Sequence, residues 1–169
     1  MPPDYDVQQV CENGHQITDC YNINQEKREG FCQECGAPTL TACPGCGVGI
    51  QGAQIEVNQS YADARFGRHK LIRRLSANVP SYCRNCGKPY PWTQRRIATA
   101  IQILTEFGDL NEAEKKTIEQ DVENISKDVP EAELSAGRIK RIWERSKSVG
   151  YEAIMEFASR TAAKILKNP

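Results

Sequence analysis

The sequence CQECGAPTLTACPGCG, residues 32–47, contains two C-x2-C pairs only seven residues apart, and it decides how the first half of the chain folds. Two further pairs flank it, one at Cys11 and His15 and the other at Cys83 and Cys86. Zinc favours four thiolate or imidazole ligands in a closed tetrahedral shell, and a C-x2-C turn directs both sulfurs at one ion. These pairs therefore predict two Zn²⁺ sites. The predicted ligands are Cys11, His15, Cys32, Cys35, Cys43, Cys46, Cys83 and Cys86.

A glycine follows the second cysteine of each C-x2-C pair, at Gly36, Gly47 and Gly87. This position of a metal-binding turn commonly needs a positive φ, which lets backbone N–H groups point at the thiolates. Glycine adopts that conformation without steric cost. The three turns are therefore expected to be zinc knuckles.

The spacing leaves open which half-sites share an ion. Sequential pairing joins the first pair with the second and the third with the fourth, whereas a cross-braced arrangement joins the first with the third. Doubling a loop costs only about 0.6 kcal/mol, so loop entropy does not decide between them. Sequential pairing is favoured because the seven residues between Cys35 and Cys43 can run as one strand from one site to the next.

The fourth ligand of the first site is also open, because Cys20 competes with His15. The short Cys11-x3-His15 spacing fits a single turn, and Gly14 supports that turn, so His15 is the favoured ligand. Cys20 is then expected to be a small buried hydrophobic residue. His69 lies between Arg68 and Lys70 and is expected to be a solvated surface imidazole.

The residue pattern predicts an α+β chain with two domains, a double zinc-ribbon domain over residues 1–92 and an α-helical bundle over residues 93–169. Short strands are expected at 16–22, 39–42 and 53–58. A basic insertion at about 59–79 is expected to form a short helix through Leu71, Ile72 and Leu75. So small a ribbon domain buries little apolar area, so metal binding should supply much of its folding free energy.

Four amphipathic helices are expected in the second domain. The first would be capped by Thr93 and end near Gly108. The second would begin at Asn111, with Glu114 completing a capping box, and stop before Pro130. The third would carry Pro130 in its first turn and end before Gly150, and the fourth would run on from Tyr151.

Composition and charge narrow the possible locations and partners. No stretch approaches the ~20 apolar residues of a transmembrane helix, and the first ten residues have no secretory signal. A cytoplasmic protein with reduced thiols is expected, which disfavours disulfides. The formal charge is zero, but seven thiolates and two Zn²⁺ would bring it to about −3. Between Tyr61 and Arg96, nine basic side chains stand against one acid.

Four segments carry a family resemblance. They are CENGHQI from Cys11, FCQECGA from Phe31, CPGC from Cys43 and YCRNCGKPYPWT from Tyr82. Together they resemble a bacterial zinc-ribbon family catalogued as a domain of unknown function, over roughly residues 7–95. The resemblance implies metal-binding roles for the eight ligands and implies no activity. Cys20 and the basic insertion lie outside the pattern.

The first functional hypothesis is a non-catalytic adaptor or scaffold that mediates protein–protein interaction. Closed four-ligand sites leave no coordination position for substrate, and no P-loop occurs, so no enzyme is expected. A protein partner or self-association is expected through the C-terminal helices. The last of these places an apolar stripe along one face. Its members are Ile154, Ala158, Ala162 and Ile165.

Two alternatives remain. A nucleic-acid-binding protein is possible because the segment 61–96 mixes cations with aromatic residues, although those aromatics more often pack a ribbon against a helix. The candidate phosphate contacts are Arg65, Arg68, Lys70, Arg73, Arg74, Arg95 and Arg96. Rubredoxin-like electron transfer is the other alternative, because CPGCG from Cys43 resembles an iron-binding knuckle.

Overall fold

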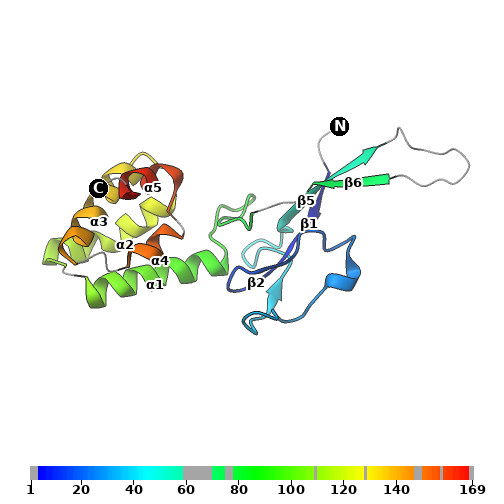
Figure 1. The fold of residues 1–169 in the computed structure, drawn as a ribbon, viewed down its shortest axis with the longest axis horizontal. Helices are drawn as coiled ribbons and strands as arrows, with labels where there is room; N and C mark the ends of the chain where they lie inside the picture. Colours follow the sequence, from blue (N-terminus) through cyan, green and yellow to red (C-terminus); the bar gives the residue numbers. More distant parts are fainter. Residues whose placement is uncertain are drawn as a thin grey trace, which may run out of the picture. The chain divides into compact units, whose positions relative to one another are not determined.

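The chain has the α+β architecture that the sequence predicted, with short antiparallel strands first and helices after them (Figure 1). The computed structural model describes residues 4–58, 70–74, 78–108, 110–127, 129–146, 150–156 and 158–167. Contacts divide the chain into two compact units, Met1–Trp92 and Thr93–Pro169. Within the described ranges, no helix is long and apolar enough to cross a membrane.

The first unit contains two three-stranded antiparallel sheets, with strand orders β1-β5-β6 and β3-β2-β4. A one-turn 3-10 helix, η1, lies between β3 and β4. The elements are β1 Asp4–Val7, β2 Gln9–Cys11, β3 Gln16–Thr18, η1 Gln25–Lys27, β4 Thr39–Leu40, β5 Gln51–Asn58 and β6 Lys70–Arg74. Such short strands offer few ladder hydrogen bonds, so other groups must stabilise the unit.

A small aromatic core holds this unit together. Tyr90 and Trp92 stack with their ring centroids 4.7 Å apart, and both side chains are buried. The Trp92 indole N–H donates to the Pro80 carbonyl at 2.9 Å, so this buried polar group is satisfied. The remaining buried members are Val10, Ile50 and the two metal-ligand candidates Cys43 and Cys83.

The predicted strands were partly wrong in extent. The segments expected at 16–22 and 39–42 shorten to β3 and β4, whereas β5 begins two residues before the predicted residue 53. β1 was not predicted, because the alternating aspartates of its sequence disfavour a strand. The structure compensates at Asp6, whose buried carboxylate accepts hydrogen bonds from Asn22 Nδ2 at 2.7 Å and the Ile23 N–H at 3.2 Å.

The helix predicted through Leu71, Ile72 and Leu75 was also wrong where the structure describes it. Residues 70–74 form β6, which pairs antiparallel with β5 in the register Ile55↔Arg73 and Val57↔Leu71. A ladder with a long neighbouring strand outweighs the weak helical pattern of so short an apolar run. The rest of the insertion, residues 59–69 and 75–77, lies outside the described residues.

The second unit is helical. Its elements are α1 Pro91–Phe107, α2 Glu112–Ser126, α3 Ala132–Arg145, α4 Tyr151–Met155 and α5 Arg160–Lys167. The first two residues of α1, Pro91 and Trp92, belong to the first unit. The capping box at Asn111 is confirmed, because its side chain accepts from the Glu114 N–H at 2.9 Å and Glu114 accepts from the Asn111 N–H at 3.0 Å. Thr93 does not cap α1 as predicted. It lies inside the helix, which starts at Pro91, a residue suited to a first turn.

The prediction of a single fourth helix was wrong, because the chain breaks between α4 and α5. At the break, the Ser159 N–H donates to the Ile125 carbonyl at 2.6 Å, across to the end of α2. The Ser159 hydroxyl accepts from the Ala162 N–H at 3.3 Å and so caps the start of α5. This tertiary hydrogen bond and the cap replace the continuous helix.

The core of the helical unit includes the C-terminal apolar stripe. Ile154 and Ala162 are fully buried among side chains from α1, α2 and α3. Ala158 and Ile165 are partly buried and pack against the same core. A buried polar network crosses the same unit, where the Asp121 carboxylate accepts from the Ser135 hydroxyl and from Arg138, each at 2.8 Å. The stripe is thus covered within its own unit.

Candidate metal centres

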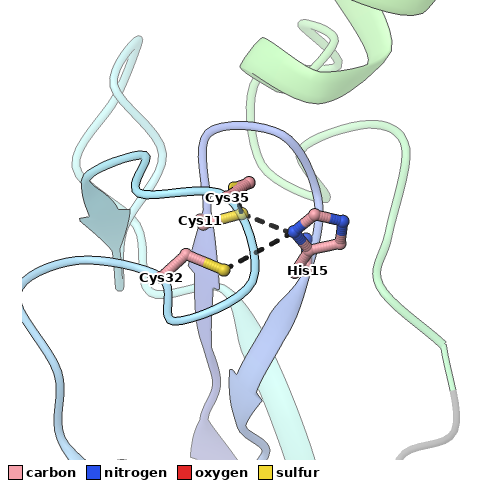
Figure 2. A group of neighbouring side chains, drawn as sticks. All are labelled: Cys11, His15, Cys32 and Cys35. Atoms are coloured by element: carbon pink, nitrogen blue, oxygen red, sulfur yellow. Dashed lines mark hydrogen bonds between the residues drawn. The ribbon is translucent and has the colours of Figure 1, made fainter.

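The first centre forms where a hairpin meets a knuckle, and its four ligand candidates converge (Figure 2). Cys11 ends β2 and His15 precedes β3, and the turn between them carries Gly14 at φ 93°. The Cys11 N–H donates to the His15 carbonyl at 2.9 Å, which fixes both side chains on the same side of the turn. The knuckle Cys32–Cys35 supplies the other two ligands. Sequential pairing is therefore the arrangement that the structure adopts.

The distances at this centre fit a tetrahedron around one ion. Bonds of about 2.3 Å to sulfur and about 2.0–2.1 Å to nitrogen imply edges of about 3.8 Å between sulfurs and about 3.6 Å between sulfur and nitrogen. The Cys11 and Cys35 sulfurs are 3.8 Å apart, and Cys32 Sγ is 3.5 Å from His15 Nδ1. A disulfide would need about 2.05 Å between its sulfurs. The residues present fit a bound metal ion.

The second centre combines the knuckle Cys43–Cys46 with the knuckle Cys83–Cys86. Cys43 Sγ lies 3.8 Å from Cys86 Sγ, and Cys46 Sγ lies 3.6 Å from Cys83 Sγ. These separations match the edge expected between two sulfurs on one ion. Because Cys43 and Cys83 belong to the aromatic core, this centre is part of the packing of the first unit.

The three knuckles share one backbone pattern. In each, the N–H of the first cysteine donates to the carbonyl five residues later, at 2.8–2.9 Å, and the glycine N–H donates to the first cysteine's carbonyl at 2.8–2.9 Å. The predicted positive φ is confirmed, at 70° for Gly36, 74° for Gly47 and 68° for Gly87. A Cβ on any of these glycines would meet no atom within 4 Å, so backbone conformation alone requires glycine there.

Backbone N–H groups lower the pKa of several thiols. The Ala37 N–H and the Asn13 side-chain amide lower the pKa of Cys35 to about 6. The N–H groups of Cys86 and Asn85 lower the pKa of Cys83 to about 6 as well. Such donors stabilise a thiolate, which is the form that binds a metal ion.

Neighbouring thiols oppose complete ionisation. The pKa of Cys86 rises to about 11: the Lys88 N–H lowers it, but burial and the three nearby sulfurs together outweigh that effect. Burial likewise raises the pKa of Cys11. A divalent cation removes this obstacle by pairing with the negative charge, so metal binding should release protons.

The competing cysteine takes no part in these clusters. Cys20 is fully buried outside both centres, and its backbone N–H donates to Thr18 Oγ1 at 3.2 Å. His15 occupies the fourth position of the first centre, with its Nε2 directed at the Glu34 carboxylate 3.7 Å away. His69 lies outside the described residues.

The candidate phosphate contacts are spread over several elements. Arg65 and Arg68 lie outside the described residues, and Lys70, Arg73 and Arg74 belong to β6. Arg95 and Arg96 lie on α1, where Arg96 Nε is 3.6 Å from a Glu156 carboxylate oxygen. Within this set, the structure therefore describes the side chains of Arg95 and Arg96 alone.

Sequence reasoning missed two residues that contact the first centre. Asn13 Nδ2 lies 3.4 Å from Cys35 Sγ as a hydrogen-bond donor. Glu34 faces the imidazole nitrogen opposite to the one that approaches Cys32, an arrangement that holds a metal-ligating histidine in one orientation. The position of both residues inside ligand motifs was the available signal.

Comparison with curated proteins and with solved structures gives no match. A family model described as "Uncharacterized protein conserved in bacteria (DUF2321)" matches residues 4–166. The match reaches well past the segment 7–95 that carries the resemblance in sequence and includes the helical unit. The chain therefore belongs to this bacterial family, DUF2321, along almost its whole length.

Proposed function

We propose that this protein is a zinc-binding, non-catalytic adaptor in which two metal ions rigidify a small binding unit. The observation that carries the proposal is the completeness of both ligand sets. Each centre has four protein donor atoms within 4.8 Å of one another, at separations that suit a tetrahedral ion. A closed shell of this kind is typical of structural zinc, whereas catalytic zinc keeps a position for water or substrate.

Zinc is favoured over iron by the donor set of the first centre. An imidazole with three thiolates is a common structural zinc set, and iron in a rubredoxin-like site takes four thiolates. The second centre, with four cysteines, suits either metal. Electron transfer therefore remains the alternative that metal analysis must exclude.

The non-enzymatic part of the proposal rests on the scarcity of suitable groups. His15 and His69 are the chain's two histidines, and His15 is a ligand candidate of the first centre. Seven reactive thiols held ready for metal imply a reducing compartment, so we also propose a cytoplasmic location.

Metal analysis combined with an absorption spectrum tests this proposal directly. The purified chain should contain two zinc ions, show no visible absorption, and lose near-ultraviolet signal from Trp92 when a chelator removes the metal. A coloured protein with one iron per chain would refute the zinc adaptor and favour electron transfer. Metal-free protein with unchanged near-ultraviolet signal would refute the structural role of the ions.

A nucleic-acid-binding function is the second candidate, because Lys70, Arg73 and Arg74 fall on β6, at the edge of its sheet. Phosphate contacts make binding strongly salt-dependent. Fluorescence anisotropy with single-stranded RNA and DNA across a salt series distinguishes the two functions. Binding that weakens steeply with salt, and further in Arg73→Gln, would favour nucleic acid.

A further inference from the structure

Phe31 is unusually exposed for a phenylalanine held in ordered structure. Its side chain is 68% exposed, although the residue directly precedes the metal-ligand candidate Cys32, which is buried. The equivalent positions of the other knuckles hold Ala42 and Tyr82, and both are half-buried. The knuckle fold therefore does not itself require an exposed aromatic side chain.

The backbone on both sides of Phe31 is fixed by hydrogen bonds. Phe31 forms a β-bridge with Pro38, and the Cys32 N–H donates to the Ala37 carbonyl at 2.8 Å. The neighbouring Thr39 N–H donates to the Gly30 carbonyl at 3.2 Å. Because this backbone is already fixed, little backbone entropy is lost when the side chain binds a partner.

A buried glutamine clamps the base of this knuckle. Gln9, only 5% exposed, donates from Nε2 to the Glu29 carbonyl at 2.6 Å and to Thr39 Oγ1 at 2.7 Å. Its Oε1 accepts from the Glu29 N–H at 3.2 Å. The ligand candidates at the tip and the hydrogen bonds of Gln9 at the base thus fix the backbone of the knuckle at both ends of the segment that carries Phe31.

The charge around the knuckle is negative. Among the described side chains of residues 5–40 that are not buried, four are acidic and two are basic: Glu12, Glu26, Glu29 and Glu34 against Lys27 and Arg28. An ion bound by three thiolates and a neutral imidazole adds one further negative charge. Glu34, at the tip of the knuckle, is 72% exposed. Glu29, at the base, accepts from Gln33 Nε2 at 2.6 Å. Such a rim attracts cations and repels nucleic acid and anionic lipid.

We propose that residues 29–38, the Phe31 knuckle, form the adaptor's docking surface for a partner segment that presents an apolar side chain flanked by lysine or arginine. Phe31 supplies the central apolar contact, and Glu34 and Glu29 pair with the flanking cations. This inference rests on the proposed adaptor function and names the chemistry of its partner. Aromatic anchors surrounded by a polar rim are the usual anatomy of such interfaces.

Binding of defined peptides to the zinc-loaded full chain tests the proposal. The probes are fluorescein-labelled twelve-residue peptides with one central tryptophan or leucine between lysines and arginines. One matched set replaces the cations by glutamate, and another replaces the central residue by glycine. The cationic apolar peptides should bind, and both matched sets should bind at least tenfold more weakly. Absence of binding by every cationic apolar peptide would overturn the proposal.

Variants locate the binding surface. Phe31→Ala should weaken the best peptide at least tenfold, and Glu34→Gln should weaken it several-fold at low salt. Phe107→Ala is the matched control, because Phe107 is 67% exposed but lies at the end of α1 in the helical unit. Equal binding by Phe31→Ala and wild type would refute the assignment. Because Phe31 is so exposed, its replacement should leave zinc content and melting temperature unchanged, which shows that the variant is folded.

Two further outcomes identify other occupants. If sedimentation shows a wild-type dimer that Phe31→Ala abolishes, the surface binds a second copy and the cationic partner is wrong. If single-stranded RNA binding requires Phe31, the occupant is nucleic acid and the proposal also fails. Zinc content is measured on every sample, so that failure of the docking proposal can be told apart from failure of the proposed zinc-binding function. A chain that holds two zinc ions but binds no peptide refutes only the docking surface.

Discussion

Gly47→Ala should weaken metal binding at the second centre without any steric clash. Gly47 has φ 74°, and a Cβ there would meet nothing within 4 Å, so the whole penalty comes from placing an L-residue in the left-handed region. That penalty is about 1–2 kcal/mol. Because folding of the knuckle is linked to metal binding, the penalty should appear as a loss of affinity of roughly 5- to 30-fold. Competition with a chromophoric zinc chelator measures it.

Gly30→Ala is the matched control for this substitution. A Cβ at Gly30 also meets nothing within 4 Å, but its φ is not in the left-handed region, so its zinc affinity should stay within about twofold of wild type. Gly47→Asn should recover part of the loss, because asparagine tolerates that region better than alanine. Equal losses in Gly47→Ala and Gly30→Ala would refute the conformational explanation.

Three further predictions concern the ligands and the helical unit. Cys83→Ser should remove one zinc per chain and the near-ultraviolet signal of the aromatic core, whereas Cys20→Ser should retain both ions. Loss of zinc from Cys20→Ser but not from His15→Ala would show that the fourth ligand of the first centre is wrongly assigned. Arg138→Met should destabilise the helical unit by about 2 kcal/mol in urea unfolding, because it leaves the Asp121 carboxylate buried without its cation. This cost is smaller than that of breaking a fully buried ion pair because the Arg138 side chain is 38% exposed. An unchanged unfolding midpoint would contradict the prediction. Burial alone would raise the pKa of Glu114, but hydrogen bonds from Arg145 and the Asn111 N–H outweigh it and lower the pKa below the ordinary 4.5. The stabilising effect of the ionised Glu114, less than about 1 kcal/mol, is therefore present above pH 4.5 and is lost as the pH falls through the lowered pKa. Glu114→Gln should reduce the slope of melting temperature against pH between pH 5 and 3, and an unchanged slope would contradict this.

The grouping of the ligand candidates into two clusters could be predicted from sequence because the signal of each knuckle is local. A C-x2-C-G turn specifies its own backbone, so the glycine conformations followed from residue type alone. The capping box at Asn111 was predictable for the same reason, since both partners lie within one turn.

The elements that depend on distant partners could not be predicted in this way. β1 exists because Asp6 finds donors at Asn22 and Ile23, and β6 exists because β5 offers it a ladder. The break before α5 depends on a hydrogen bond from Ser159 to Ile125 on another helix. In each case a tertiary contact overrides a weak local preference.

Sequential pairing also has a consequence for how the nascent chain matures. The first centre has all its ligands once residue 35 has left the ribosome, but the second must wait for Cys86, 51 residues later. At about 5–20 residues per second, synthesis of that interval takes roughly 3–10 s. For the last 40 of these residues, from Cys46 to Cys86, Cys43 and Cys46 form a half-site that is open to oxidants and to competing metals. Synthesis rate therefore sets how long this chain depends on a reducing, metal-supplied environment before its aromatic core can close.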